Sequence, residues 1–158
     1  MVKSRGIVIL TALALSGCDT EPAGDRSSTI SGFSGPAITR TMDAEQIALG
    51  ERVFVRHCAE CHGDAGQGDP NWRQVGSDGF YRPPPLDGSG HSWHHSTAWL
   101  KEMIRSGSAP GTGNMPAWRG VLSESEIDAV IAWFQSRWPD PVYAAWYENH
   151  QRARGGVQ

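Results

Sequence analysis

The chain has 158 residues, of which 39% are hydrophobic and 20% charged, and its formal charge is −3. This length suffices for the core of one compact domain, and the acidic balance argues against a nucleic-acid partner. A modestly acidic surface instead suits a basic patch on a protein partner.

The N-terminus has the features of a bacterial lipoprotein signal. Lys3 and Arg5 precede an apolar run over residues 6–15 that is too short to span a bilayer, and the run ends in Leu15-Ser-Gly-Cys18. This ending resembles a lipobox, so we predict that residues 1–17 are a signal peptide and that Cys18 is lipidated. An ordinary secretory signal with a coincidental cysteine is the alternative. Asp19 resembles the residue that retains many such lipoproteins at the inner membrane, which predicts a periplasm-facing protein anchored there by lipid.

Residues 18–42 are rich in Ser, Gly, Thr and Pro, which predicts a flexible tether. A single domain is predicted over 43–140, with three helices and no convincing strand. The first helix begins near Asp43, which can cap it with Gln46 at the third helical position. Its predicted inner face consists of Ile47, Gly50, Val53 and Phe54.

This helix leads into Cys58-Ala-Glu-Cys61-His62, the spacing of a covalent haem attachment site. Two thiols three positions apart on one helical turn can add to the two vinyl groups of a porphyrin, and the adjacent imidazole becomes the proximal iron ligand. A structural zinc site would need four ligands, and the third cysteine of the chain is the distant Cys18. A thioredoxin-like dithiol belongs at the start of a helix after a strand, whereas this motif follows a helix. We therefore interpret the motif as a haem site.

The segment after the motif contains Pro83-Pro84-Pro85 and then a histidine cluster, His91, His94 and His95. The prolines stiffen the loop. The histidines could bind copper, ligate the haem iron or donate to the haem propionates, and packing at the haem edge is the plainer interpretation. Four aromatic residues flank these loops and are expected to form walls of the pocket: Trp72, Tyr81, Trp93 and Trp118.

Two further helices follow. One is predicted from a cap at Ser96 or Thr97 to a stop at Gly107. The other begins at the capping box Ser123-x-x-Glu126 and ends before Pro139. Residues 141–158 form a C-terminal extension, in which Val142 to Arg152 is predicted to be a short helix that docks on the domain through Trp146 and Tyr147.

Across residues 43–140 the chain resembles the class I cytochrome c family. The shared pattern consists of Gly50-x-x-x-Phe54, Cys58-x-x-Cys61-His62-Gly63, Gly66-x-Gly68, Asn114-Met115-Pro116 and the aromatic Trp133 in the last helix. The resemblance implies a small all-α fold around one covalent haem c, in which the terminal helices cross closely at Gly50. It also implies that a proline carbonyl accepts a hydrogen bond from His62, without selecting one proline.

The same resemblance implies Met115 as the second axial ligand. Met103 is the nearest rival, but its place in an apolar helical stripe predicts a core residue. A thioether opposite an imidazole raises the reduction potential and leaves no open iron position.

The predicted function is therefore that of a lipid-anchored monohaem electron carrier that serves redox partner proteins and has no catalytic acid, base or nucleophile. Three alternatives remain open: a haem subunit of a periplasmic dehydrogenase or oxidase complex, a haem enzyme or gas sensor with an open axial position, and a copper-handling protein that uses His91, His94 and His95.

Overall fold

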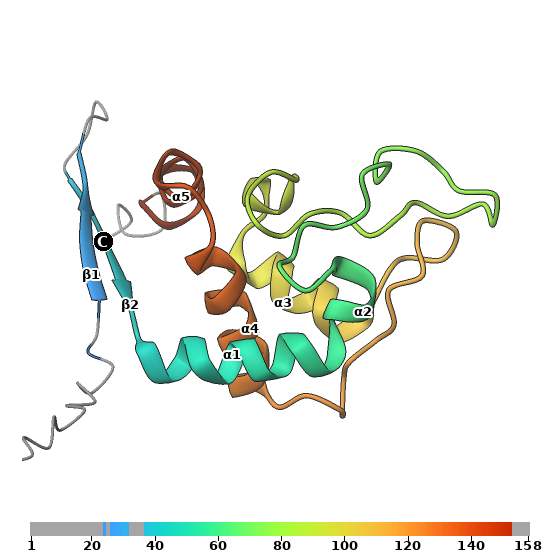
Figure 1. The fold of residues 1–158 in the computed structure, drawn as a ribbon, viewed down its shortest axis with the longest axis horizontal. Helices are drawn as coiled ribbons and strands as arrows, with labels where there is room; N and C mark the ends of the chain where they lie inside the picture. The colour runs from blue at the N-terminus through green and yellow to red at the C-terminus, as the bar shows by residue number, and fades with distance from the viewer. Residues whose placement is uncertain (1–23, 25, 32–36, 153–158) are drawn as a thin grey trace, which may run out of the picture.

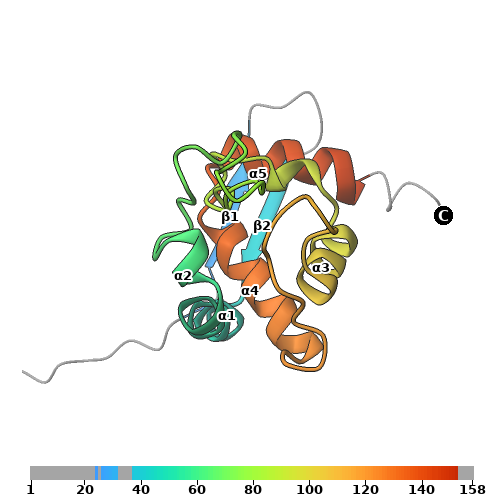
Figure 2. The same ribbon diagram turned by 90° about the vertical axis from the view of Figure 1, so that its right-hand side faces the viewer.

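Two helices, α1 (Ala44–His57) and α4 (Glu124–Ser136), cross at the centre of the fold (Figures 1 and 2). Gly50 lies at the crossing and has no room for a side chain, because a Cβ there would lie 2.0 Å from the Ala129 carbonyl oxygen. The rings of Phe54 and Trp133 stack beside it with centroids 4.1 Å apart. The predicted close crossing at Gly50 is thus confirmed.

The structure is a computed structural model that describes residues 24, 26–31 and 37–152. Besides α1 and α4 it contains α2 (Ala59–His62), η1 (Ser92–His94), α3 (Thr97–Ser106), α5 (Asp140–Tyr147) and the π-helical turn η2 (Glu148–Arg152). The helix α5 begins two residues before the predicted Val142, and its Trp146 is 4% exposed, as the docking prediction requires. The central core consists mainly of buried side chains from α1 and α4: Val53, Phe54, Ile127, Val130, Ile131, Trp133 and Phe134.

The helices begin at the predicted caps. One carboxylate oxygen of Asp43 accepts hydrogen bonds from the backbone N–H groups of Glu45 and Gln46, at 2.9 and 3.1 Å. Ser96 caps α3, and Ser123 forms the full capping box of α4 with Glu126. These bonds satisfy N–H groups that have no partner within the helix, so local sequence sets where α1, α3 and α4 start, whereas α2 and α5 have no side-chain cap.

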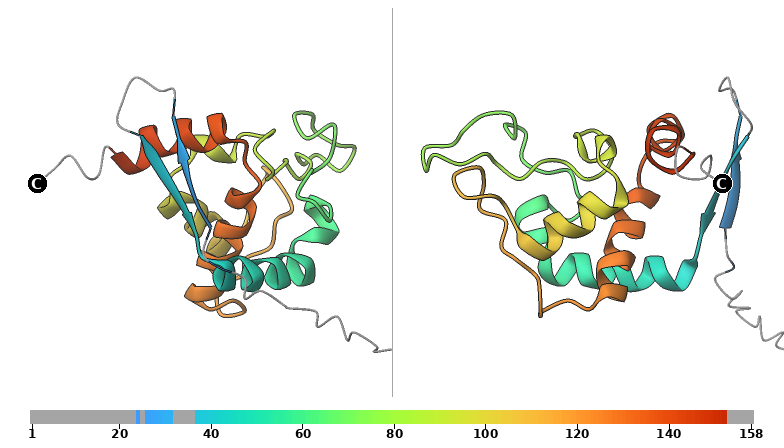
Figure 3. Two further views of the ribbon diagram at one scale, coloured as in Figure 1. Left: turned by 60° about the vertical axis from the view of Figure 1, so that its left-hand side comes forward. Right: turned by 180° about the vertical axis from the view of Figure 1, so that it is seen from behind.

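The N-terminal region departs from the prediction. Strands β1 (Arg26–Ile30) and β2 (Ile38–Met42) pair antiparallel with Ile30 opposite Ile38, and the pair lies against α5 (Figure 3). The expectation of an all-α fold with a flexible tether over 18–42 is therefore wrong for these strands. Alternation along β2 places Ile38 and Arg40 on the buried face, where Ile38 packs with Ile30 and Ala144.

Arg40 attaches this hairpin to the helical body. Arg40 is 4% exposed, and its guanidinium donates to the Trp138 carbonyl oxygen at 2.9 Å, to the Gln135 carbonyl oxygen and to the Asp140 carboxylate at 3.2 Å. It also lies 4.4 Å from the centroid of the Tyr143 ring. A cation thus satisfies carbonyl groups at the C-terminal end of α4, where the helix dipole is negative.

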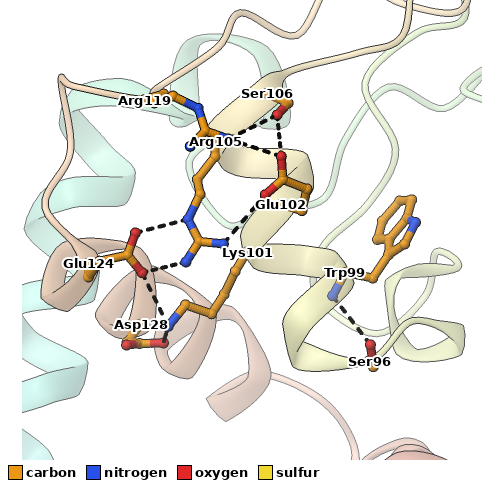
Figure 4. A network of polar contacts seen from close by, with 9 residues as sticks. All are labelled: Ser96, Trp99, Lys101, Glu102, Arg105, Ser106, Arg119, Glu124 and Asp128. Carbon is orange, nitrogen blue, oxygen red and sulfur yellow. Dashed lines mark hydrogen bonds and ion pairs between the residues drawn. The ribbon is translucent and has the colours of Figure 1, made fainter.

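A polar network joins α3 to α4 (Figure 4). Arg105 on α3 binds both carboxylate oxygens of Glu124, with Nε 2.9 Å from one of them, and Lys101 lies 2.7 Å from Asp128. The loop after Met115 is hydrogen-bonded to α3, because the N–H groups of Trp118 and Arg119 each donate at 3.1 Å to carbonyls of that helix. This network holds the loop that presents Met115.

The predicted signal peptide, Cys18 and Asp19 lie outside the described residues. Within the part of the chain that the structure describes, no helix is both long and apolar enough to cross a bilayer. The lipid anchor and the boundaries of the leader stay predictions.

Candidate haem site

A cavity of about 800 Å³ lies between the helices and the long loops, within the usual size range for cofactor sites. Cys58, Cys61, His62 and Met115 all line it, so the structure brings together the four residues predicted for the haem. Its other walls are largely apolar and come from α1, α3, α4 and the loops: Phe54, Leu86, Leu100, Ile104, Trp118, Val130 and Phe134.

The attachment motif occupies the junction of α1 and α2. The N–H of Cys58 donates to the Phe54 carbonyl at 2.8 Å, and the N–H of His62 donates to the Cys58 carbonyl at 2.9 Å. This single turn presents both sulfurs and the imidazole to one cavity. Burial, together with the nearby Cys61 thiol, raises the pKa of Cys58 to about 11, so its sulfur is a neutral thiol before attachment.

His62 is 9% exposed, and its Nδ1 lies 2.9 Å from the carbonyl oxygen of Pro84. The structure thereby selects Pro84 from the three prolines. Burial lowers the pKa of His62, although the bond to the Pro84 carbonyl opposes the shift. The imidazole is therefore neutral with its proton on Nδ1, which leaves the Nε2 lone pair free for a metal.

Gly68 allows Pro84 to come this close. Its φ is +65°, and a Cβ there would lie 2.4 Å from the backbone nitrogen of Pro85. The Gly68 N–H donates to the His62 carbonyl at 2.7 Å, so the glycine links the motif to the proline segment. The Gly66-x-Gly68 pattern thus positions the acceptor of the proximal imidazole.

Met115 reaches the cavity from a loop that returns to the end of α3. The Ser108 N–H donates to the Met115 carbonyl at 3.0 Å, and the Ser108 hydroxyl accepts from the Met115 N–H at 3.2 Å. Met103, expected in the core, lines the same cavity from α3. Both thioethers are thus candidate ligands, and the family pattern favours Met115.

The histidine cluster divides between the cavity and the surface. His91 and His95 line the cavity, with ring centroids 5.5 Å apart, whereas His94 is exposed and stacks on Trp93 at 3.7 Å. Among the described residues, no three His, Cys, Asp or Glu side chains are grouped so that they could hold a metal ion.

The chemistry of the wall matches a haem, whose faces are apolar and whose edge carries two carboxylates. Two buried polar atoms in lining residues, His91 Nδ1 and Ser92 Oγ, have no hydrogen-bond partner, and Arg73 and Arg82 also line the cavity. Buried polar atoms normally have partners, so these atoms indicate a ligand with polar groups at that edge. The residues present fit the group that the motif predicts.

Three of the four predicted aromatic walls are confirmed: Trp72, Tyr81 and Trp118 line the cavity. The prediction for Trp93 is wrong, because its indole N–H donates to the Gly90 carbonyl and its ring faces His94. Arg73, Ser92 and Trp99 line the cavity without a prediction. They belong to no motif, and only the fold brings them to the site.

Comparison with known proteins agrees with this geometry. Residues 45–134 match the family described as cytochrome c oxidase, cbb3-type, subunit III. The cbb3-type oxidase subunit FixP of Bradyrhizobium diazoefficiens is 34% identical over 117 residues, 72% of this chain and 35% of that protein. Cytochrome c6 of Euglena gracilis is 35% identical over 81 residues, 51% of this chain and 80% of that protein.

A thiosulfate dehydrogenase of Stutzerimonas stutzeri is 27% identical over 94 residues, 55% of this chain and 29% of that protein. The chain spans about a third of the length of the cbb3-type subunits that it matches. No solved structure gives a significant match. From the attachment motif, the cavity and these matches together, the chain belongs to the cbb3-type subunit III family of cytochrome c domains and is a monohaem class I cytochrome c that carries covalent haem c.

Proposed function

We propose that the protein is a one-electron carrier in which His62 and Met115 ligate the haem iron and a lipid on Cys18 tethers the domain to the periplasmic face of the inner membrane. The observation that carries the proposal is the shared cavity: one helical turn supplies Cys58, Cys61 and His62, and a loop 53 positions after His62 supplies Met115.

The bound haem supplies a one-electron couple at its iron. The residues of the chain hold that couple in a fixed environment. Cys58 and Cys61 would attach the porphyrin, while the bond from the Nδ1–H of His62 to the Pro84 carbonyl would orient the ring and leave Nε2 available to the iron. Apolar walls from α1, α3 and α4 would pack against the haem faces, and a thioether on the iron would leave no position open to a substrate.

The assignment of Met115 is tested by removing each candidate thioether in turn. Met115→Ala should abolish the methionine–iron charge-transfer band of the oxidised protein and lower the reduction potential, because an oxygen or nitrogen ligand that favours ferric iron replaces the thioether. Met103→Ala is the matched control from the same cavity and should keep the band. A band that survives Met115→Ala and disappears in Met103→Ala would transfer the ligand role to Met103.

The tether is tested separately from the haem. In a bacterial host that processes lipoproteins, the parent protein should fractionate with the inner membrane, and Cys18→Ser should be released or accumulate with an uncleaved leader. Incorporation of labelled fatty acid into Cys18→Ser, or its absence from the parent protein, would contradict lipidation at Cys18. The haem spectrum should be the same in both, because Cys18 is not part of the described haem site.

A second candidate is a subunit role in a terminal oxidase, which the similarity to FixP and CcoP subunits favours. A carrier should elute from size-exclusion chromatography of detergent extracts at the size of the single chain, with one haem. Stable co-elution with a larger haem-containing oxidase would favour the subunit role.

A further inference from the structure

Two neighbouring residues in the cavity wall, His91 and Ser92, each leave a buried polar atom without a hydrogen-bond partner. His91 Nδ1 belongs to the residue that precedes η1, and Ser92 is 6% exposed. The third such atom among the described residues, Gln135 Nε2, borders a separate cavity of about 60 Å³. The other two atoms belong to consecutive residues that both line the haem cavity, and a ligand there can satisfy them.

The surroundings of this pair are positively charged. The guanidinium of Arg73 lies 4.1 Å from the centroid of the Trp72 ring, and the Trp72 and His91 rings stack with centroids 5.1 Å apart. The three side chains are thus in successive contact at the wall. Burial lowers the pKa of His91, and the charges of His94 and Arg73 lower it further. Glu60 is the one acidic residue among the described residues that line the cavity. The chemistry of this wall suits a carboxylate.

The pair also lies at the appropriate end of the cavity. In haem the two vinyl groups and the two propionates occupy opposite edges of the porphyrin, and the motif on α2 fixes the vinyl edge. The segment η1 lies on the side of α5, away from α1 and α2 (Figures 1 and 3). A haem attached through Cys58 and Cys61 would therefore direct its propionate edge away from the cysteines and toward the side where this segment lies.

We infer that His91 and Ser92 donate hydrogen bonds to a haem propionate, through the Nδ1–H of His91 and the hydroxyl of Ser92, with Arg73 supplying positive charge beside them. This inference rests on haem c occupying the cavity, and it is independent of whether Met115 or Met103 ligates the iron. The role that it assigns to His91 is to hold the haem, not to bind copper.

Hydrogen bonds to a propionate also affect the reduction potential of the haem. Donors that bind a propionate disperse its negative charge, and without them the carboxylate stabilises ferric iron more strongly. Loss of the His91 donor should therefore lower the potential. The groups that face His91 are Arg73, His94 and His95, and His150 approaches the same cluster through the His94 carbonyl. The comparison between variants must accordingly be made at one pH.

The test compares the haem-loaded parent protein with His91→Phe, His91→Asn and His94→Phe. Resonance Raman spectroscopy reports the propionate bending band, and spectroelectrochemistry at pH 7 reports the potential. His91→Phe should shift the band and change the oxidised-to-reduced ratio about threefold to tenfold toward ferric, where tenfold corresponds to 59 mV for one electron. His91→Asn retains an N–H donor and should restore both values. His94→Phe, at the exposed neighbour, should change neither.

Equal band positions in His91→Phe and the parent protein would overturn the inference, even with an altered potential, because packing alone could change the potential. If His91→Phe fails to load haem, Ser92→Ala decides, since removing one hydroxyl leaves the packing in place; an unshifted band there overturns the inference. Absence of covalent haem from the parent protein on a haem-stained gel would refute the haem site itself, which is a separate failure.

Discussion

Adding one methyl group at Gly50 should destabilise the fold. In Gly50→Ala the new Cβ would lie 2.0 Å from the Ala129 carbonyl oxygen and 2.7 Å from Trp133 Cβ, whereas ordinary contacts begin near 3.4 Å. The helices α1 and α4 would have to separate by about 1.4 Å, the difference between those distances. Overpacking typically costs about 1–3 kcal/mol. The cost here should lie at the upper end, because the new Cβ meets backbone atoms of α4, which cannot turn aside as a side chain can.

Alanine favours the helix by about 1 kcal/mol relative to glycine, which offsets part of this cost. The free energy of unfolding should therefore fall by about 2 kcal/mol. In a domain of roughly 100 residues this lowers the melting temperature by about 8–16 °C. Guanidinium unfolding of the haem-loaded protein, followed by tryptophan fluorescence, measures the free energy of unfolding. Ala48→Leu adds volume on the exposed face of the same helix and should change it by less than about 0.5 kcal/mol. An increase in stability for Gly50→Ala, as propensity alone predicts, would refute the reasoning.

Three further predictions concern the site and its supports. Gly68→Ala should raise the reduction potential, because displacing the proline segment removes the carbonyl acceptor that makes the proximal imidazole more basic. Gly79 has a similar φ of +82° but open space around it, so the control Gly79→Ala should leave the potential unchanged. Arg105 holds the pKa of Glu124 at about 2, below the ordinary 4.5, so the pair's contribution to stability is complete above pH 4.5 and is lost as the pH falls through about 2. Glu124→Gln should therefore make the stability less dependent on pH between about 2 and 4.5. An acid unfolding curve identical to that of the parent protein would contradict this role of the pair. Arg40→Met should cost about 2–3 kcal/mol, because buried carbonyls at the end of α4 lose a charged donor, and hydrogen exchange should accelerate in β2 while the haem spectrum is unaltered.

The helices and the attachment turn could be predicted because their signals are local. Asp43, Ser96 and Ser123 each cap a helix within three residues of the groups they satisfy. The Cys58-x-x-Cys61 spacing places both sulfurs on one turn whatever the rest of the fold does. Such features depend only on short-range geometry, so the sequence alone contains them.

The remaining features depend on contacts between distant parts of the chain. The hairpin was missed because Ile30, Ile38 and Arg40 are sparse among small polar residues, and their burial requires α5 and the end of α4. Pro84 could not be told from its neighbours, because the fold of the loop around Gly68 selects it. Met103 could be named as a rival to Met115, but only the fold brings both thioethers to one cavity.

Ligation by His62 and Met115, as proposed, would leave the haem iron with no position open to an external ligand. An absorption spectrum of the reduced protein with and without carbon monoxide tests it most directly, provided that the parent protein carries covalent haem. With both axial positions filled, the reduced Soret band should be unchanged by carbon monoxide, and the oxidised protein should show the methionine–iron charge-transfer band near the red end. A Soret band that shifts on addition of carbon monoxide would contradict the claim and favour a haem enzyme or gas sensor.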